Sequence, residues 1–178
     1  MNLPTSLIDM DNVTALFPVV RENSMNTVLV QESLRFNNLL LKILTTLEDL
    51  KLAQKGQILI TEQLSATRLQ LIQGFVPEAW IEVSYPSLKP LASYIRDLNL
   101  RIETLEKWIK DKSPPVVFWL SGFFFTQSFL TAILQNYARK YQIEIDALQF
   151  DFAFTNKEDP IDREQEVFNM ATAEERGL

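Results

Sequence analysis

The stretch "PPVVFWLSGFFFTQSFLTAILQNYARKY", residues 114–141, determines whether a membrane-spanning fold or a helical bundle is expected for this protein. No charged residue occurs between Lys112 and Arg139. The stretch is therefore long enough to cross a bilayer, for which ~20 mostly apolar residues suffice. An aromatic loop followed by an amphipathic helix would have the same composition, so the order of residues within the stretch has to separate the two interpretations.

The first part of the stretch cannot be a continuous helix. Pro114 and Pro115 are incompatible with a regular helix interior, and Ser121-Gly122 is a second break. Between these breaks, residues 116–120 ("VVFWL") are β-branched and aromatic, which predicts a strand or an extended segment.

From Thr126 onward the pattern has the period of an amphipathic helix. Its apolar stripe consists of Phe129, Leu130, Ile133, Leu134, Tyr137 and Tyr141. Its opposite face consists of Ser128, Thr131, Gln135 and Arg139. A polar face of this kind is poorly solvated in lipid, and both flanks of the stretch are basic, so no positive-inside bias is present. We therefore expect a helix of a soluble bundle and no membrane contact.

Three longer helices are predicted before this stretch, over residues 27–55, 61–73 and 87–112. In the first and the last, apolar residues recur at spacings of four and three. The second is predicted from its start at Thr61 and its stop at Gly74 and Pro77. The stripe of the first is Phe36, Leu40, Ile43, Leu47 and Leu50, widened by Leu34, Leu41 and Leu44. The stripe of the last is Leu91, Ile95, Leu98, Ile102 and Leu105, continued by Trp108 and Ile109. Both stripes are expected to pack within one domain; a coiled-coil seam is the alternative for the first.

The ends and the polar faces of these helices are predicted from local signals. The expected N-caps are Asn26, Thr61 and Ser87, and the expected C-terminal stops are Gly56 and Gly74. A short helix within residues 7–17 is expected to be capped by Asp9 or Asp11. Trp80 and Tyr85 are expected to fix their connector to the core. The charged side chains of the 87–112 helix are expected to be solvated; they are Arg96, Asp97, Arg101, Glu103, Glu106 and Lys107.

Composition excludes several functions. The protein has 178 residues, no cysteine, no histidine and four glycines. These counts leave no thiolate or imidazole chemistry and no phosphate-binding glycine loop. A net charge of −6 argues against nucleic-acid binding. The carboxylates Glu62, Glu78 and Asp151 fall on separate predicted elements, so we expect no catalytic, cofactor-binding or metal residues. The N-terminus has no signal-peptide pattern.

After residue 141 the pattern changes to that of a strand. Leu148, Phe150, Phe152 and Phe154 alternate with other residues, which predicts a half-buried strand with one aromatic face. Residues 157–178 are polar and acidic and show no second alternating strand.

Several long blocks resemble one protein family in order and spacing. "ENSMNTVLVQESLRFNNLL" (22–40), "SYPSLKPLASYIRDL" (84–98), "VFWLSGFFFTQSFLTAILQNYARKY" (117–141) and "IEIDALQFDFAF" (143–154) are similar to the C-terminal domain of dynein heavy chains, especially axonemal ones. Together the similar blocks cover about residues 3–156.

The resemblance implies a non-catalytic structural domain. In that family the domain follows the sixth AAA+ module, consists of a helical bundle and a small β-barrel, has no ATP site of its own, and braces the motor ring. ATP and Mg bind elsewhere in the full-length motor. The implied partners are the AAA+ modules and the dynein intermediate and light chains, with the microtubule contacted only indirectly and with no nucleic acid or membrane. The implied location is the cytoplasm and cytoskeleton, in the axoneme of a cilium or flagellum.

This sequence departs from the family pattern because its last residues do not resemble the hairpins of the barrel. A fragment, a splice product and a truncated paralogue are all compatible with this. The predicted fold is mainly α: a bundle of about four main helices, then one or two strands of an incomplete barrel and a polar tail. The predicted divisions are 1–141, the helical part; 142–156, the first strand region; and 157–178, the divergent tail. A free-standing adaptor that binds axonemal partners is the alternative function.

Aromatic residues are the predicted packing or interface residues, because aromatic side chains supply much of the apolar contact area in cores and interfaces. They are Trp119, Phe123, Phe124, Phe125, Phe150, Phe152 and Phe154.

Overall fold

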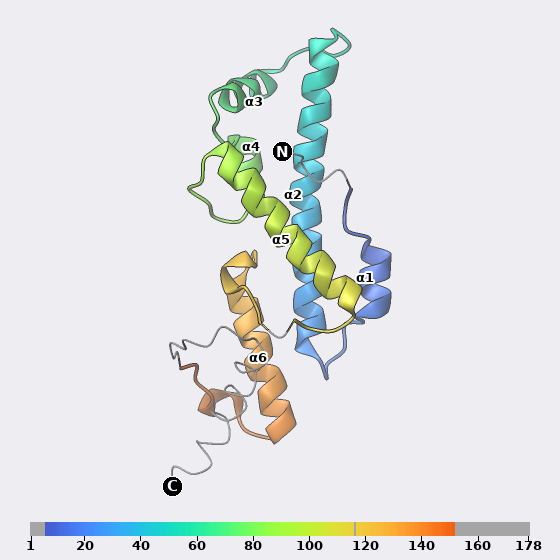
Figure 1. The fold of residues 1–178 in the computed structure, drawn as a ribbon, viewed down its shortest axis with the longest axis vertical. Helices are drawn as coiled ribbons and strands as arrows, with labels where there is room; N and C mark the ends of the chain where they lie inside the picture. Colours follow the sequence, from blue (N-terminus) through green and yellow to red (C-terminus); the bar gives the residue numbers. More distant parts are fainter. Residues whose placement is uncertain (1–5, 116, 152–178) are drawn as a thin grey trace.

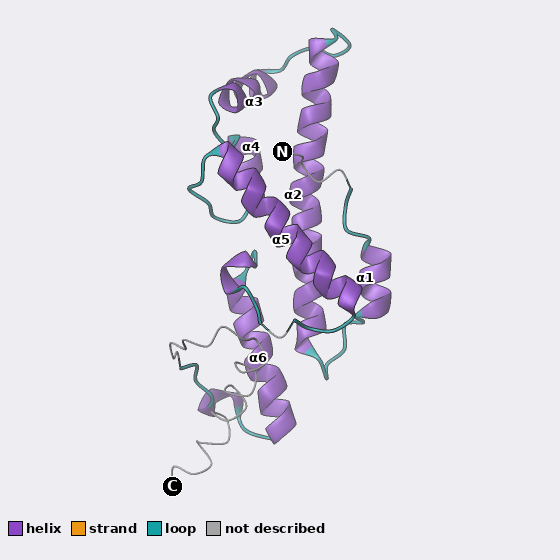
Figure 2. Cartoon of the chain, viewed as in Figure 1, coloured by secondary structure: helices purple, strands orange, loops and turns teal. Residues whose placement is uncertain are grey.

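The computed structural model describes residues 6–115 and 117–151, and these residues form a mainly helical fold (Figures 1 and 2). The helices are α1 (Met10–Leu16), α2 (Ser24–Gln54), α3 (Glu62–Ile72), α4 (Glu78–Ile81), α5 (Leu91–Asp111) and α6 (Thr126–Tyr141). Two 3-10 turns, η1 (Leu120–Gly122) and η2 (Ile145–Ala147), flank α6. The mainly α prediction is confirmed. None of the described helices is long and apolar enough to cross a membrane.

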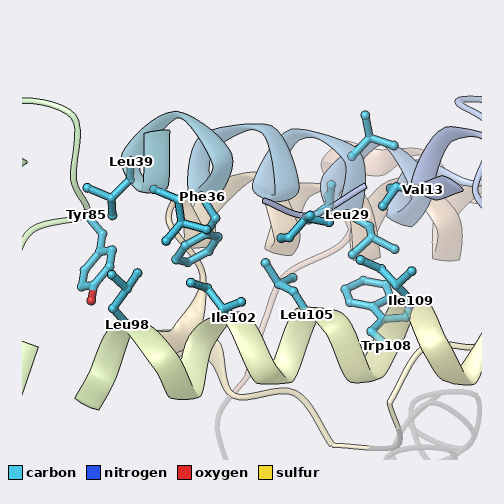
Figure 3. Close-up of a cluster of buried hydrophobic side chains, with 14 of the residues drawn as sticks. Val13, Leu29, Phe36, Leu39, Tyr85, Leu98, Ile102, Leu105, Trp108 and Ile109 are labelled. Carbon is cyan, nitrogen blue, oxygen red and sulfur yellow. The ribbon is translucent and has the colours of Figure 1, made fainter. Parts of the chain in front are cut away.

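The core lies between α2 and α5, whose buried side chains face each other (Figure 3). Leu29, Phe36 and Leu39 of α2 face Leu98, Ile102 and Leu105 of α5. All six side chains are buried, as are Leu40 and Ile43. The apolar stripes of these two helices therefore pack against each other within the protein, as predicted.

The widened part of the α2 stripe does not join this core. Leu34 is 46% exposed and Leu41 is 54% exposed, whereas Leu44 is half-buried. The prediction that Leu34 and Leu41 pack inside the bundle is wrong, because α1, α4, α5 and α6 leave this side of α2 uncovered.

The start of α2 also differs from the prediction. The N-cap is Asn23, whose side chain accepts a hydrogen bond from the backbone N–H of Met25 at 3.1 Å. Asn26, the predicted cap, lies inside the helix. Its amide instead donates to the carbonyl of Pro18 at 2.9 Å, which secures the turn that precedes α2.

The start of α5 lies later in the sequence than predicted, whereas that of α2 lies earlier. Pro90 is the N-cap in an extended conformation and provides no side-chain hydrogen bond. The hydroxyl of Ser87, the predicted cap, accepts from the N–H of Lys89 at 3.3 Å and so closes a turn before the helix. Pro90 fixes the helix start because the residue that precedes a proline is disfavoured in helical conformation.

Four other helix ends follow the sequence signals. Asp9 caps α1 by accepting from Asn12 N–H at 3.1 Å, and Thr61 caps α3 by accepting from Leu64 N–H at 3.2 Å. Gly56 and Gly74 follow α2 and α3 with φ of 71° and 78°, the left-handed conformation that glycine adopts without strain. Trp80 and Tyr85 are buried, so the prediction that they fix the connector to the core is confirmed.

No strand is present in the described part of residues 148–154 or of residues 116–120, for which an extended segment was the other prediction and where Trp119 is extended. Residues 117–119 are irregular and lead into η1, whereas Val116 lies outside the described residues. Residues 148–151 follow η2 without forming a strand, and Phe152 and Phe154 lie outside the described residues. A strand needs a neighbour to satisfy its backbone groups, and no described segment provides one here. The division of the sequence at residue 141 stays a prediction.

Candidate functional site: the aromatic segment between α5 and α6

The aromatic segment, residues 117–125, fills the space between α2, α5 and α6. The ring of Phe118 meets Trp108 of α5 edge-on, with centroids 5.4 Å apart. The ring of Phe123 stacks on Phe129 of α6 at 4.6 Å. The segment therefore contributes the side chains by which α6 packs onto the rest of the bundle.

Phe124 completes this packing on the other side of the segment. Its ring meets Phe36 of α2 edge-on, with centroids 5.1 Å apart, and meets Tyr85 at 5.6 Å. Tyr85 in turn stacks on Tyr94 of α5 at 5.5 Å. Rings from four parts of the sequence, namely the aromatic segment, α2, the connector before α5 and α5 itself, thus form one continuous cluster.

Glu32, a fully buried carboxylate on α2, holds the end of the aromatic segment. Its oxygens accept hydrogen bonds from the backbone N–H groups of Phe124 at 2.5 Å and Phe125 at 3.1 Å. Arg35 donates a third bond to Glu32 at 3.0 Å. A buried carboxylate is costly unless it is hydrogen-bonded in this way.

The same carboxylate supports the first turn of α6. Phe125 is the N-cap residue of α6, and its phenyl ring has no acceptor for the free N–H groups of the first turn. A negative group close to a helix N-terminus is favoured by the helix dipole. Glu32 of α2 therefore provides at this helix start the negative charge that the local sequence lacks.

A second buried charge, Arg101 of α5, holds the opposite side of the segment. Its guanidinium lies 3.9 Å from the ring centroid of Tyr85 and 5.2 Å from that of Trp119. Its Nη1 also donates to the carbonyl of Phe123 at 3.5 Å. Arg101 therefore binds both the rings and the backbone of this region.

Asp97 neutralises Arg101. Its carboxylate accepts from Arg101 Nε at 2.7 Å and from Lys89 Nζ at 2.5 Å. Asp97 and Arg101 are both buried, so the prediction that they belong to a solvated face is wrong. The reason is that Tyr85 and the aromatic segment cover this part of α5. The other four charged residues of that set are exposed, as predicted.

Burial and these contacts shift the pKa values of Asp97, Tyr85 and Tyr94. Burial raises the pKa of Asp97, but the hydrogen bonds from Lys89 and Arg101 outweigh that effect and hold the pKa below its usual value of 3.8. Burial raises the pKa of Tyr85 far above its usual value of 10.0, and burial likewise raises that of Tyr94. At neutral pH the cluster therefore contains an ionised aspartate and neutral tyrosines.

Gly122 allows Trp119 to fold back over η1. A Cβ atom at position 122 would lie 2.6 Å from Cε3 of the Trp119 ring. Any larger residue would displace the indole from its position beside Arg101. The Ser121-Gly122 break in the sequence thus corresponds to a close approach of a ring to the backbone.

The polar face of α6 is also part of the packing. Asn136 Oδ1 accepts from the backbone N–H of Ser24 at 2.9 Å, and the hydroxyl of Ser24 donates to Gln135 at 2.7 Å. Arg139 donates to the same hydroxyl at 2.8 Å. Gln135 and Arg139 lie on the polar face that the sequence predicts, and this face meets the N-terminus of α2.

The predicted aromatic residues divide into three groups. Trp119, Phe123 and Phe124 are half-buried and are brought together at the aromatic segment. Phe125 is 51% exposed, with the Arg35 guanidinium 5.4 Å from its ring centroid, and Phe150 is exposed beyond α6. Phe152 and Phe154 lie outside the described residues. Whether any of them forms an interface stays a prediction.

The buried charged residues were missed at the sequence level, although signals for them exist. Glu32 lies four residues after Val28 and four before Phe36, which places it on the buried face of α2. Asp97 and Arg101 have opposite charges at a spacing of four, which pairs them on one helix face.

The carboxylates weighed as candidate chemical groups are not brought together in the described part of the structure. Glu62, Glu78 and Asp151 are exposed on separate elements. No three His, Cys, Asp or Glu side chains of the described ranges approach one another closely enough to hold a metal ion. The charged groups at the aromatic segment instead hold backbone and rings in place.

The fold and this site define a helical-bundle domain. In it, the buried charged residues Glu32 and Arg101 hold an aromatic segment between α2, α5 and α6. Comparison with known proteins assigns the family. The family model for the C-terminal domain of dynein heavy chains matches residues 1–175. The protein belongs to this family.

The curated relatives are axonemal dynein heavy chains. The sequence is 51% identical to human dynein axonemal heavy chain 3 over 150 residues, which is 84% of this sequence and 4% of the relative. It is 52% identical to mouse dynein axonemal heavy chain 1 over 82% of this sequence and 3% of the relative. It is 54% identical to rat dynein axonemal heavy chain 12 over 81% of this sequence and 5% of the relative. The protein therefore spans only a small fraction of the length of these relatives.

Proposed function

We propose that this protein acts as a non-catalytic structural part of an axonemal dynein heavy chain, the C-terminal domain that braces the AAA+ ring. The observation that carries this proposal is the family match over residues 1–175, together with about 50% identity to axonemal heavy chains. The aromatic segment supports it, because buried charge pairs and stacked rings favour a stiff domain over a mobile one.

In this role, the nucleotide chemistry of the motor belongs to other parts of the heavy chain. ATP and Mg bind in the AAA+ modules, and this domain contributes no nucleotide site. Its direct partners are those modules, with dynein intermediate and light chains in the same assembly and the microtubule contacted only indirectly. The corresponding location is the axoneme of a cilium or flagellum.

A replacement experiment tests the bracing role. The matched segment of an axonemal heavy chain motor is deleted, and residues 1–178 of this protein are fused in its place. We expect the fusion to recover the thermal stability and the microtubule-stimulated ATPase rate that the deletion loses. A fusion that behaves like the deletion in both measurements would contradict the proposal.

A free-standing adaptor that binds axonemal partners is the second candidate. The observation that favours it is the closed core of the helical part, in which α1, α2, α4, α5 and α6 all bury residues. Size-exclusion chromatography of the isolated protein separates the two. A stable monomer favours the adaptor, whereas self-association favours a domain that has lost its covering surface.

A further inference from the structure

Ser113 lies in the connector between α5 and the aromatic segment, and it is the only Ser or Thr of the sequence that precedes a proline. Ser113 and Pro114 are both exposed, and both lie outside the helices. Pro114 also disfavours helical backbone at Ser113, because the proline ring clashes with the preceding residue in that conformation. The serine hydroxyl is therefore accessible in a non-helical segment, as an enzyme that modifies the side chain requires.

Pro114 gives this serine a chemical feature that the other hydroxyl residues lack. Proline has no backbone N–H. An N–H that enters a binding site without an acceptor is costly, so a kinase whose site offers none prefers substrates in which proline follows the serine. Proline-directed protein kinases make this selection. Ser113 fits their class of substrate, whereas the exposed Ser121 of η1, which precedes Gly122, does not.

We propose that Ser113 is a phosphorylation site for a proline-directed protein kinase, and that phosphate there loosens the last turn of α5. In the reaction, Oγ of Ser113 forms a bond to the γ-phosphorus of ATP. The bond from that phosphorus to the β,γ-bridging oxygen breaks, ADP leaves with that oxygen, and the hydroxyl proton is released. The kinase binds the ATP, so no nucleotide site of this protein is involved.

The phosphate would act on the carbonyl end of α5. The hydroxyl of Ser113 donates to the backbone carbonyl of Asp111, the last residue of α5, at 3.3 Å. Phosphorylation removes this donor and adds about −1.5 to −2 charges at pH 7. Negative charge is unfavourable at a helix C-terminus, where the free carbonyls already carry partial negative charge. Both changes therefore weaken the last turn.

The lysines beside the site do not cancel this effect. Lys110 and Lys112 line the hollow between α1 and the end of α5, and two carboxylates line the same hollow. The charged groups around this helix end balance in number, three against three: Lys107, Lys110 and Lys112, and Asp9, Glu106 and Asp111. All six are exposed, so an ion pair between a lysine and the phosphate would be weak and screened by salt.

Loosening of the last turn would reach the aromatic segment. Trp108 and Ile109 lie in this turn and are buried. The ring of Trp108 meets Phe118 edge-on, and Pro115 lines the same small hollow as these two rings. A phosphate on Ser113 would therefore make the packing of the aromatic segment on α5 less rigid.

The first test asks whether Ser113 accepts phosphate. The full 178-residue protein is incubated with an active mitogen-activated protein kinase and Mg-ATP, and the modified residue is located by mass spectrometry. Ser113→Ala removes the acceptor, whereas Pro114→Ala keeps the serine and removes only the proline that follows it. Ser121→Ala is the matched control, because Ser121 is an exposed serine without a following proline. Circular dichroism melting verifies that each variant is folded.

We expect a single phosphate, on Ser113, in the unmodified protein and in Ser121→Ala, and none in Ser113→Ala. Pro114→Ala should be phosphorylated at least about tenfold more slowly, because its new N–H finds no acceptor in the kinase. No incorporation into the unmodified protein, or equal incorporation into Ser113→Ala, would overturn the site. Equal rates for Pro114→Ala and the unmodified protein would overturn the class of kinase.

Amide hydrogen exchange then tests the effect on α5. Residues 108–112 should exchange about two- to fivefold faster in the phosphorylated protein, the size of change that a charge at a helix end produces. Residues 36–43 of α2 are the internal control and should exchange at the same rate in both forms. Equal or slower exchange of residues 108–112 after phosphorylation would overturn the loosening and show that the neighbouring lysines hold the phosphate.

Discussion

The carboxylate of Glu32 on α2 accepts the backbone N–H of Phe124, which lies 92 residues later in the sequence. Through this bond and its neighbour at Phe125, a helix near the N-terminus fixes the point at which α6 begins. The stability of the helical part should therefore depend strongly on one acidic side chain that is fully buried.

Glu32→Ala should destabilise the fold by about 2–4 kcal/mol, because it removes the acceptor of two part-buried backbone N–H groups, those of Phe124 and Phe125. Chemical denaturation monitored by circular dichroism measures this change. Glu48→Ala is the control, since the Glu48 carboxylate lies 3.8 Å from Lys51 on the surface and should contribute less than about 1 kcal/mol. Equal unfolding free energies for the two variants would contradict the role given to Glu32.

Leu98→Ala should cost about 2–5 kcal/mol, because Leu98 is fully buried between α2 and α5 and truncation leaves a cavity. Leu100→Ala, two residues away on the exposed side of α5, should change stability by less than about 0.5 kcal/mol. Thermal melting of both variants checks the face of α5 directly. If Leu98→Ala has the same melting temperature as the unmodified protein, Leu98 does not pack between α5 and α2 as described.

Stability should fall at both ends of the pH range. The pKa of Asp97 is lower in the folded protein than its usual value of 3.8. The stabilising contribution of Asp97 is therefore present above about pH 4 and is lost as the pH falls through the folded-state pKa. The pKa values of Tyr85 and Tyr94 are raised above 10.0, so their contribution is present below about pH 10 and is lost as the pH rises further.

Urea unfolding between about pH 2 and pH 11 measures both limbs of this dependence. Asp97→Asn should lower stability at neutral pH and flatten the acid limb, while leaving the alkaline limb in place. An acid limb of the same steepness in Asp97→Asn would show that other carboxylates dominate the acid response.

Gly122→Ala should displace the Trp119 indole, because the new Cβ would lie 2.6 Å from the ring. Fluorescence of a variant in which Trp80 and Trp108 are replaced by Phe reports on Trp119 alone. We expect a shifted emission maximum and easier quenching by acrylamide. Ser121→Ala, at the exposed neighbouring position, should leave the emission unchanged.

The isolated protein should not bind Mg-ATP, because it has neither a glycine-rich phosphate loop nor a histidine. Isothermal titration calorimetry should record no heat beyond that of dilution. A dissociation constant in the micromolar range would refute the assignment of nucleotide binding to other parts of the motor.

The helical elements were predictable from sequence because their apolar residues repeat with the helix period. Phe36, Leu40 and Ile43 are buried as their spacing predicts. The caps at Asp9 and Thr61 were also correct, since each depends on a local side chain. The predicted caps Asn26 and Ser87 failed where a neighbouring asparagine or a proline provided the stronger local signal.

The burial of Asp97 and Arg101 was not predictable from sequence in the same way. The periodicity of α5 shows that Asp97 and Arg101 share a face, but not that Tyr85 and the segment carrying Phe123 fold over that face. Contacts of this kind depend on segments that are distant in sequence. Composition also shows that the protein is rich in aromatic residues, but not which rings meet.

The 92-residue span between Glu32 and Phe124 also constrains the order in which the helices can pack during synthesis. During synthesis, α2 leaves the ribosome long before the residues that satisfy its buried carboxylate. Until then Glu32 has to stay hydrated, which keeps that side of α2 open. Closing a loop of this size has an entropic cost that local helix formation does not. Docking of α6 should accordingly be the last folding event, and a nascent polypeptide halted before residue 125 should remain prone to chaperone capture.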